Sequence, residues 1–177
     1  MAQTKKKKRF FDVEIPLIKR ETQLQAYEIE ELNGRYINYD LTRILRGKNS
    51  VIQFKVVAKE KEATTIPIAI KLLPSFTKRM VRKGTDYVED SLIIKSKDKE
   101  IEIKPLLITR RKVSRAIRKA LREKARQELI EYAKEKEAEK IIDDILKNIL
   151  QKKLSLTLKK IYPLSLCEIR FFRIKEK

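Results

Sequence analysis

The sequence predicts an α+β protein in which a mostly antiparallel, barrel-like sheet is followed by a long basic helix, a further helix and a terminal strand. Two observations predict this order. Up to Thr109, short runs rich in β-branched residues are separated by turn residues, as in strands joined by short connections. From Arg110 to about Gln151 the chain has neither Gly nor Pro and is dense in Ala, Leu, Arg, Lys and Glu, which favours helix.

The length and the turn residues together predict the domain organisation. A chain of 177 residues allows one domain with a sizeable core. Only three Gly and five Pro occur, and neither an internal repeat nor a flexible linker is visible. We therefore expect a basic N-terminal arm over 1–9 and a single α+β domain over 10–177, from which a helix over 110–150 projects.

Each element of the first part is predicted by its own residues. Alternating apolar and polar residues, or β-branched runs bounded by Gly, Pro, Asn or Ser, indicate strands. The predicted strands are Phe10–Leu17, Arg35–Tyr39, Val51–Ala58, Thr64–Leu73, Tyr87–Ser96 and Glu100–Thr109, and the acidic run Thr22–Leu32 predicts either a strand or a short helix. Pro74 begins a short basic helix that runs to about Lys83, where Gly84 can cap it.

The second part is predicted to be helical almost to its end. One interruption is expected near Ala138–Ile142, and the last helix ends over Leu154–Ile161. Tyr162 and Pro163 then form a turn before a final strand, Cys167–Ile174.

The net charge is the most informative property for function. Forty-four Lys and Arg face twenty-five Asp and Glu, which gives +19 with no His present. Such a surface repels itself until a polyanion neutralises it, and nucleic acid gains further from counterion release. A highly charged surface kept for solubility is the alternative. Acidic lipid is disfavoured, because no lipidation signal is visible and the longest uncharged run, Ala63–Ile70, is too short to span a bilayer.

The cations cluster in three places. Between Thr109 and Arg126 there are nine Lys or Arg and one acid, Glu123. A basic run precedes Phe10, and a further cluster lies on the short helix after Pro74. The candidate RNA-binding residues are Lys5, Lys6, Lys7, Lys8, Arg9, Lys78, Arg79, Arg82, Lys83, Arg110, Arg111, Lys112, Arg115, Arg118, Lys119, Arg122 and Arg126.

The long helix is predicted to present its arginines on one face. At 100° per residue, a stripe of five arginines shares one side, which suits Arg because its planar fork grips phosphate oxygens. Val113, Ile117 and Ala120 fall on the opposite side and are expected to pack on the sheet. The arginines of the stripe are Arg111, Arg115, Arg118, Arg122 and Arg126.

Aromatic side chains are a further candidate contact, because they can stack on unpaired bases. Phe10 and Phe11, directly after the basic run, are the best placed of these. Tyr87, Tyr162, Phe171 and Phe172 lie in strand-like contexts and are expected to be core residues.

The sequence argues against an enzyme. Without His there is no histidine base or metal ligand, and no glycine-rich phosphate loop occurs. The adjacent carboxylates, such as Asp143 and Asp144, point in different directions and are typical of solvated surface. Cys167, alone in its residue type, is expected to be a small core residue of a protein in the reducing cytoplasm. We expect no cofactor, no metal, no small-molecule substrate and no membrane partner.

Four stretches resemble a known family: RFFDVEIP, NGRYINYDLTRI, the segment from Arg79 to Gln127 and KKIYPLSLCEIRFFRIK. They are similar to the archaeal and eukaryotic small-subunit ribosomal protein family called S-three-A-e, also written S-one-e. Asn38 departs from the Glu of the family signature, Asp98-Lys99 from its hairpin Asp-Gly, and the chain is shorter than typical members.

The resemblance implies a structural protein of the ribosomal small subunit that takes part in translation. It implies a position on the platform, where the family contacts ribosomal RNA near its 3′ end and the mRNA exit, beside other platform proteins. The implied RNA-facing residues are Lys5–Arg9, Arg79, Arg82, Lys83 and the Arg110–Arg126 helix face. A free-standing basic protein that coats nucleic acid is the alternative function.

Overall fold

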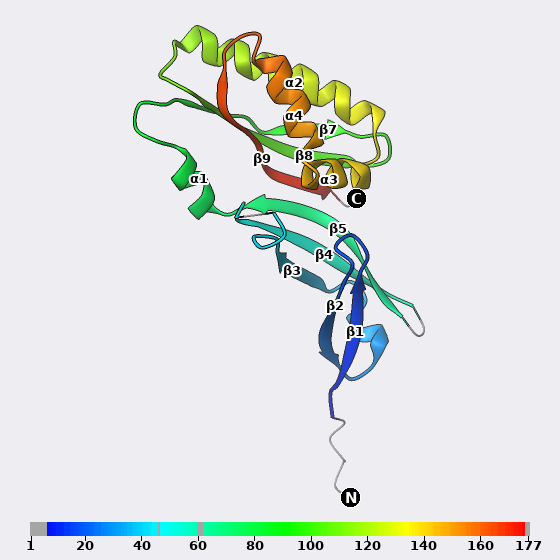
Figure 1. Cartoon of the computed structure of the whole chain (residues 1–177). Coiled ribbons are helices and arrows are strands. Elements are labelled where there is room, and N and C mark those ends of the chain that lie inside the picture. The colour runs from blue at the N-terminus through cyan, green and yellow to red at the C-terminus, as the bar shows by residue number, and fades with distance from the viewer. Residues whose placement is uncertain (1–6, 46, 60–61, 176–177) are drawn as a thin grey trace, which may run out of the picture. The chain divides into compact units, whose positions relative to one another are not determined.

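The computed structural model describes residues 7–45, 47–59 and 62–175 and contains nine strands and four α-helices within them (Figure 1). The strands are β1 Arg9–Ile15, β2 Arg20–Ala26, β3 Tyr36–Asp40, β4 Ser50–Ala58, β5 Ala63–Leu72, β6 Tyr87–Glu89, β7 Leu92–Lys95, β8 Glu100–Thr109 and β9 Leu164–Lys175. The helices are α1 Pro74–Met80, α2 Arg115–Glu135, α3 Ala138–Leu146 and α4 Ile149–Leu158, with a 3-10 turn at Ile29–Leu32. The predicted α+β class is confirmed.

The sheet is open and does not close into a barrel. Its main path runs β2-β1-β5-β9-β8-β6, while β4 pairs with β3 and β5, and β7 pairs with β8. The pairs β1/β2, β5/β9, β6/β8, β7/β8 and β8/β9 are antiparallel, whereas β1 and β5 pair in parallel at Val13↔Ala63.

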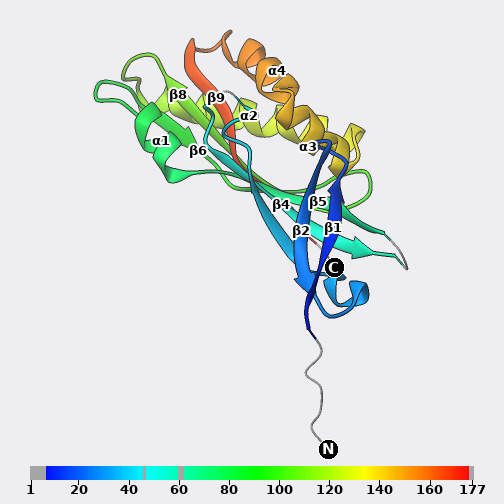
Figure 2. The same ribbon diagram turned by 60° about the horizontal axis from the view of Figure 1, so that its bottom comes forward.

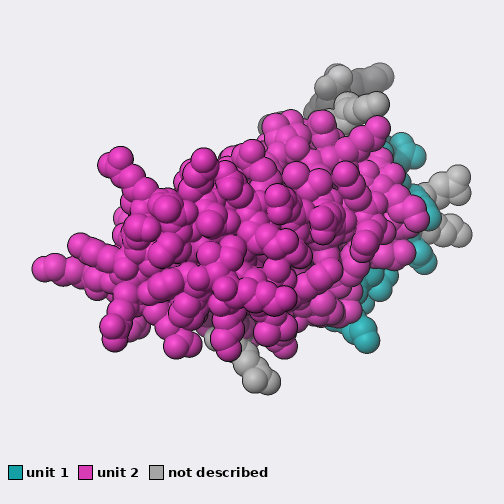
Figure 3. Space-filling view, turned by 90° about the horizontal axis from the view of Figure 1, so that it is seen from above, with its two compact units in different colours: residues 1–39, 52–68 teal, residues 40–51, 69–177 magenta. Residues whose placement is uncertain are grey.

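The chain divides into two compact units, which Figure 3 distinguishes by colour. Unit 1 comprises residues 1–39 and 52–68, and unit 2 comprises residues 40–51 and 69–177. Strands β4 and β5 each have residues in both units.

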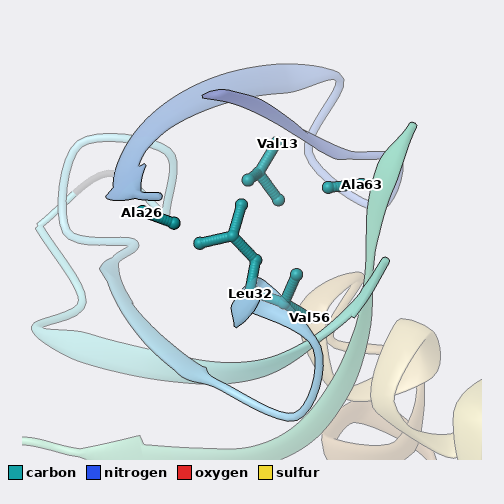
Figure 4. Close-up of a cluster of buried hydrophobic side chains, with 5 residues drawn as sticks. All are labelled: Val13, Ala26, Leu32, Val56 and Ala63. Atoms are coloured by element: carbon teal, nitrogen blue, oxygen red, sulfur yellow. The ribbon is translucent and has the colours of Figure 1, made fainter. Parts of the chain in front are cut away.

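Unit 1 is built around a small apolar core (Figure 4). Alternation along β1 buries Val13 and Ile15 and leaves Asp12 and Glu14 exposed, because successive side chains of a strand point to opposite faces. The core cluster consists of Val13, Ala26, Leu32, Val56 and Ala63. The run Thr22–Leu32 was predicted to be either a strand or a short helix, and it contains both: most of β2, followed by the 3-10 turn.

In unit 2 the helices α2, α3 and α4 pack against the sheet (Figures 1 and 2). Helix α2 contacts β6 and β7, and α4 contacts β9 and α2. Helix α2 buries Leu121, Ala125 and Leu129, which recur every four residues and so line one side. The segment over 110–150, which was predicted to project as a helix with one interruption, is therefore packed; it contains α2 and α3, and α4 begins within it at Ile149.

The first helix break has a cause distant in sequence. At Lys136 the backbone is extended, and its carbonyl oxygen accepts hydrogen bonds from the Ser96 hydroxyl (2.6 Å) and the Lys97 N–H (3.3 Å). The Asp98 carboxylate accepts the N–H of Ala138 at 2.9 Å and so caps α3. The β7–β8 hairpin thus binds the C-terminal end of α2 and the N-terminal end of α3.

The second break lies at Asn148, whose φ of +59° is left-handed. Asn tolerates this conformation better than other residues with a Cβ. The interruption near Ala138–Ile142 was therefore placed slightly too late, and the second break was not predicted.

The predicted strand Tyr87–Ser96 is divided into β6 and β7, both antiparallel to β8. Between them the Asp90 carboxylate accepts the N–H of Ser91 at 2.9 Å, which turns the chain locally. The prediction of Glu100–Thr109 is confirmed as β8, and the final strand begins at Leu164, earlier than predicted.

Candidate nucleic-acid interface

The loop between β8 and α2 carries three consecutive cations, Arg110, Arg111 and Lys112, and its backbone is held by Asp86. The Asp86 carboxylate accepts the N–H of Val113 at 2.9 Å. Its carbonyl oxygen accepts the N–H of Thr109 at 2.9 Å. These bonds fix the two ends of the cationic loop.

Thr109 completes this anchor. Its side chain is fully buried, and its hydroxyl accepts the N–H of Asp86 at 3.1 Å and lies 2.7 Å from the carbonyl oxygen of Arg111. Asp86 and Thr109 therefore position the loop, although sequence reasoning missed both. The only signal was a polar residue at the end of a buried strand.

The same anchor brings the α1 cluster to this loop. After α1 the chain turns at Thr85, whose hydroxyl donates to the carbonyl oxygen of Arg82 at 2.7 Å, and Asp86 follows directly. Arg82 and Lys83 thus precede Asp86 on one side, while the cations of the β8–α2 loop flank its partners on the other. We call Arg82, Lys83, Arg110, Arg111 and Lys112 the basic junction.

All five side chains of the basic junction are exposed. None of them has an ion-pair or side-chain hydrogen-bond partner among the described residues. Their charge is therefore not neutralised within the described chain and remains open to an external anion.

The rest of the α1 cluster is partly engaged. The Arg79 guanidinium donates to the carbonyl oxygen of Gly47 at 3.1 Å and lies 5.5 Å from the ring centre of Phe76. Lys78 is exposed. Arg79 therefore ties α1 to a neighbouring loop, while Lys78 extends the basic junction along the helix.

The predicted arginine face of the long helix needs correction. Helix α2 begins at Arg115, with Ser114 as its N-cap, so Arg111 is not on the helix. The fully buried stripe begins at Leu121, and Arg118 precedes it by three residues on the same side. Arg118 is accordingly half-buried, with its Nε buried and without a partner among the described atoms.

Three residues expected to pack on the sheet, Val113, Ile117 and Ala120, are only half-buried. Two of the helix cations predicted to bind RNA are paired: Arg126 with Asp90 at 3.3 Å and Lys119 with Glu123 at 3.8 Å.

Arg115 and Arg122 remain exposed, without a described ion-pair partner. They extend the basic junction along α2.

The N-terminal basic run belongs to unit 1, whereas the other two basic clusters belong to unit 2. Lys5 and Lys6 lie outside the described residues, whereas Lys7, Lys8 and Arg9 are exposed. The Lys8 ammonium is 5.6 Å from the ring centre of Tyr27, at cation–π distance.

The two adjacent phenylalanines differ. Phe10 is 63% exposed, whereas Phe11 is partly buried and packs against the unit 1 core. Of the two, Phe10 is thus the one exposed enough to stack on a base. Of the four aromatic residues predicted to be core, Phe172 is fully buried, while Tyr87 is 53% exposed and the other two are half-buried.

The net charge is concentrated in unit 2. This unit contains 33 Lys and Arg against 17 Asp and Glu, a net charge of +16, whereas unit 1 contains 11 against 8, a net charge of +3. The electrostatic attraction for a polyanion therefore comes mostly from unit 2.

Other chemistry finds little support in the described part of the chain. Residues 7–45, 47–59 and 62–175 contain no group of three or more His, Cys, Asp or Glu that could hold a metal ion. Among the same residues, no helix is both long and apolar enough to cross a membrane. Burial raises the pKa of the Cys167 thiol to about 12, so the thiol stays protonated at neutral pH.

Comparison with known proteins gives the family. The sequence matches the Ribosomal S3Ae family over residues 2–177. It is 30% identical over 180 residues to the small ribosomal subunit protein eS1 of Nanoarchaeum equitans (strain Kin4-M), a match that covers 97% of this chain and 91% of that protein. The resemblance seen in the sequence is thereby confirmed. The chain belongs to the Ribosomal S3Ae family and is a structural protein of the small ribosomal subunit that takes part in translation.

Proposed function

We propose that the chain binds ribosomal RNA on the platform of the small subunit, near the mRNA exit and the 3′ end of that RNA. It would remain ribosome-bound in the cytoplasm, beside other platform proteins. The observation that carries this proposal is the basic junction, in which five exposed cations have no described counter-charge. The place on the platform is supported by the family resemblance.

The geometry of the basic junction suits a phosphate backbone. Arg110 and Arg111 can each offer two parallel N–H groups to phosphate oxygens, while Lys112 acts as a point charge. Because Asp86 and Thr109 already order the loop, little conformational entropy remains to be lost on binding. Such contacts position a protein on RNA without reading its sequence.

Exposed cations continue the basic junction along two helices. Lys78 continues it on α1, and Arg115 and Arg122 continue it on α2. Lys7, Lys8 and Arg9 add a contact from unit 1, with Phe10 available for stacking. Ribosomal RNA that follows the junction and α2 would neutralise the unpaired cations along this path.

Site-directed cross-linking tests both the surface and its location. Ala116 is exposed on α2 between Arg115 and Lys119, so Ala116→Cys introduces a reactive thiol without removing a cation. Native Cys167 should react slowly because its thiol pKa is raised to about 12. A photoactivatable reagent on the new thiol is then activated in assembled small subunits, and the modified nucleotides are mapped.

The matched control is Glu139→Cys, an exposed position on α3 outside the basic surface. We expect the Ala116→Cys protein to modify nucleotides near the 3′ end of the ribosomal RNA, and the control to give much weaker modification there. Modification by the Ala116→Cys protein of a distant RNA region would refute the platform location. Equal or absent modification by both proteins would refute the surface.

The alternative of a free-standing architectural protein makes a different prediction. On sucrose gradients at low salt, the proposed function requires co-migration with small subunits. A dispersed profile that DNase digestion changes would favour the alternative.

A further inference from the structure

A second basic surface lies on α4, which the sequence analysis treated only as the end of a helix. Between Asp144 and Glu168 the chain has five Lys and no carboxylate. This interval contains all of α4 and the turn that follows it. Its charge is therefore not balanced by neighbours in sequence.

The lysines occupy the outward side of α4. The helix buries Leu150, Leu154 and Leu158. At 100° per residue, the opposite side is centred on Leu156, which is 69% exposed. Lys152 lies beside it on the helix and Lys153 lies further round, while Lys159 is the C-cap and Lys160 lies in the turn that follows; all four are exposed.

Three of these lysines are electrostatically free in the described chain. Lys152, Lys159 and Lys160 have no ion-pair or side-chain hydrogen-bond partner among residues 7–45, 47–59 and 62–175. Lys153 differs, because its ammonium lies 5.2 Å from the ring centre of Tyr132. By contrast, Lys147, at the start of the same interval, pairs with Asp143 at 2.5 Å.

The register of the sheet places the C-terminal end of this surface at the same end of the sheet as the β8–α2 loop of the basic junction. Thr109, the last residue of β8, pairs with Leu164, the first residue of β9. The loop that starts at Arg110 therefore lies next to the turn that joins Lys160 to β9. The lysines at the end of α4 thus lie at the end of the sheet from which the junction loop leaves.

We propose that the outward face of α4 and the turn that follows it form a second contact surface for ribosomal RNA, in which Lys152, Lys159 and Lys160 bind phosphates. This inference rests on the proposed function, since it adds a contact to it. A protein partner is disfavoured because Lys is depleted in protein–protein interfaces and because one exposed leucine is a small apolar centre. Leu156 can instead lie against ribose in the shallow minor groove of an RNA helix.

The test compares two triple variants that remove the same charge. One is Lys152→Gln, Lys159→Gln and Lys160→Gln. The control is Lys124→Gln, Lys140→Gln and Lys147→Gln, which removes lysines that already pair with carboxylates at 3.1, 3.0 and 2.5 Å. Circular dichroism and thermal unfolding establish that both variants fold as the parent does. Binding to small-subunit RNA is then measured from 50 to 200 mM salt.

The α4 variant should bind about tenfold more weakly at intermediate salt, and its salt slope should flatten by roughly two to three units, about 0.7–0.9 for each of the lost phosphate contacts. The control should stay within about twofold of the parent. Equal losses in both variants would overturn the proposal, since net charge alone would explain them. So would an α4 variant that binds like the parent.

Lysine acetylation locates the contact and separates the two proposals. Lys152, Lys159 and Lys160 should be protected both by naked ribosomal RNA and in the assembled subunit. Protection only in the subunit would assign the face to a neighbouring protein and overturn the inference. If the parent itself fails to bind the RNA, the proposed function fails as well; if the parent and control bind and the α4 variant is unaffected, only the inference fails.

Discussion

The anchor of the basic junction predicts that one acidic residue helps the chain to bind RNA. Replacing Asp86 with Ala removes the acceptor of the Val113 N–H, a bond of 2.9 Å to a carboxylate. A hydrogen bond to a charged group contributes roughly 1.5–3 kcal/mol. We therefore expect a free energy of unfolding about 2 kcal/mol lower, or a Tm lower by roughly 4–8 °C for a domain of this size.

The effect on RNA affinity distinguishes position from charge. Loss of a negative charge alone would strengthen binding to RNA, whereas loosening of the cationic loop would weaken it. Ordering one loop residue costs about 1–2 kcal/mol, so we expect roughly tenfold weaker binding to small-subunit RNA at fixed salt.

Two further variants separate the causes. Asp86→Asn carries the same charge as Asp86→Ala but keeps an acceptor oxygen, and it should recover much of both losses. Asp143→Asn changes the net charge equally on α3, and it should not weaken binding. Urea unfolding and filter binding measure the two quantities. If Asp86→Ala binds RNA as tightly as the parent or more tightly, the loop is not positioned by this anchor.

Three other outcomes are expected. First, Asp98→Ala should lower the free energy of unfolding, measured in urea, by roughly 1 kcal/mol, because the N–H of Ala138 at the start of α3 loses its cap. Partial burial raises the pKa of the Asp98 carboxyl, but hydrogen bonds, led by the one from Ala138, bring that pKa below its ordinary value of 3.8. The difference in stability between the parent and the variant should therefore shrink as the pH falls below about 3.8. Second, hydrogen bonds from Lys136 to Asp144 and Tyr132 raise the pKa of Lys136 to about 12. The stability that these bonds contribute should therefore persist up to about pH 10.5 and be lost towards pH 12. Unfolding of the parent and of Asp144→Asn at alkaline pH measures this contribution. Third, with six to ten phosphate contacts, RNA affinity should fall about a thousandfold or more between 50 and 200 mM salt, and a flat response in filter binding would contradict the electrostatic interpretation.

The sequence predicted best the elements whose causes are local. Strand β8 was predicted with its observed bounds because Ile101 and Ile103 alternate with charged residues and a tight hairpin precedes them. The break between α2 and α3 was misplaced because its cause is not local. Its carbonyl and N–H groups bind Ser96 and Asp98, each 40 residues away.

The candidate site was predicted in composition but not in geometry. The arginine stripe was assigned to the face opposite Val113 and Ile117, yet the buried phase of α2 is set by its second half, from Leu121 onward. Arg118 consequently lies on the packed side. Asp86 could not be assigned a role from sequence, because its partner Val113 is 27 residues away and belongs to another loop.

The distribution of paired and unpaired cations separates two kinds of basic residue on unit 2. Several lysines that have a carboxylate three or four residues away along a helix form the ion pair, as at Lys124, Lys140 and Lys147. In the basic junction the nearby Asp86 carboxylate accepts the Val113 N–H, and on α4 no acid lies nearby in sequence. In both places the cations stay exposed and without a described ion-pair partner. Because Thr109 pairs with Leu164, the unpaired cations of the β8–α2 loop and those directly after α4 lie at the same end of the sheet. Cations that lie near one another in this way can bind successive phosphates of one RNA backbone.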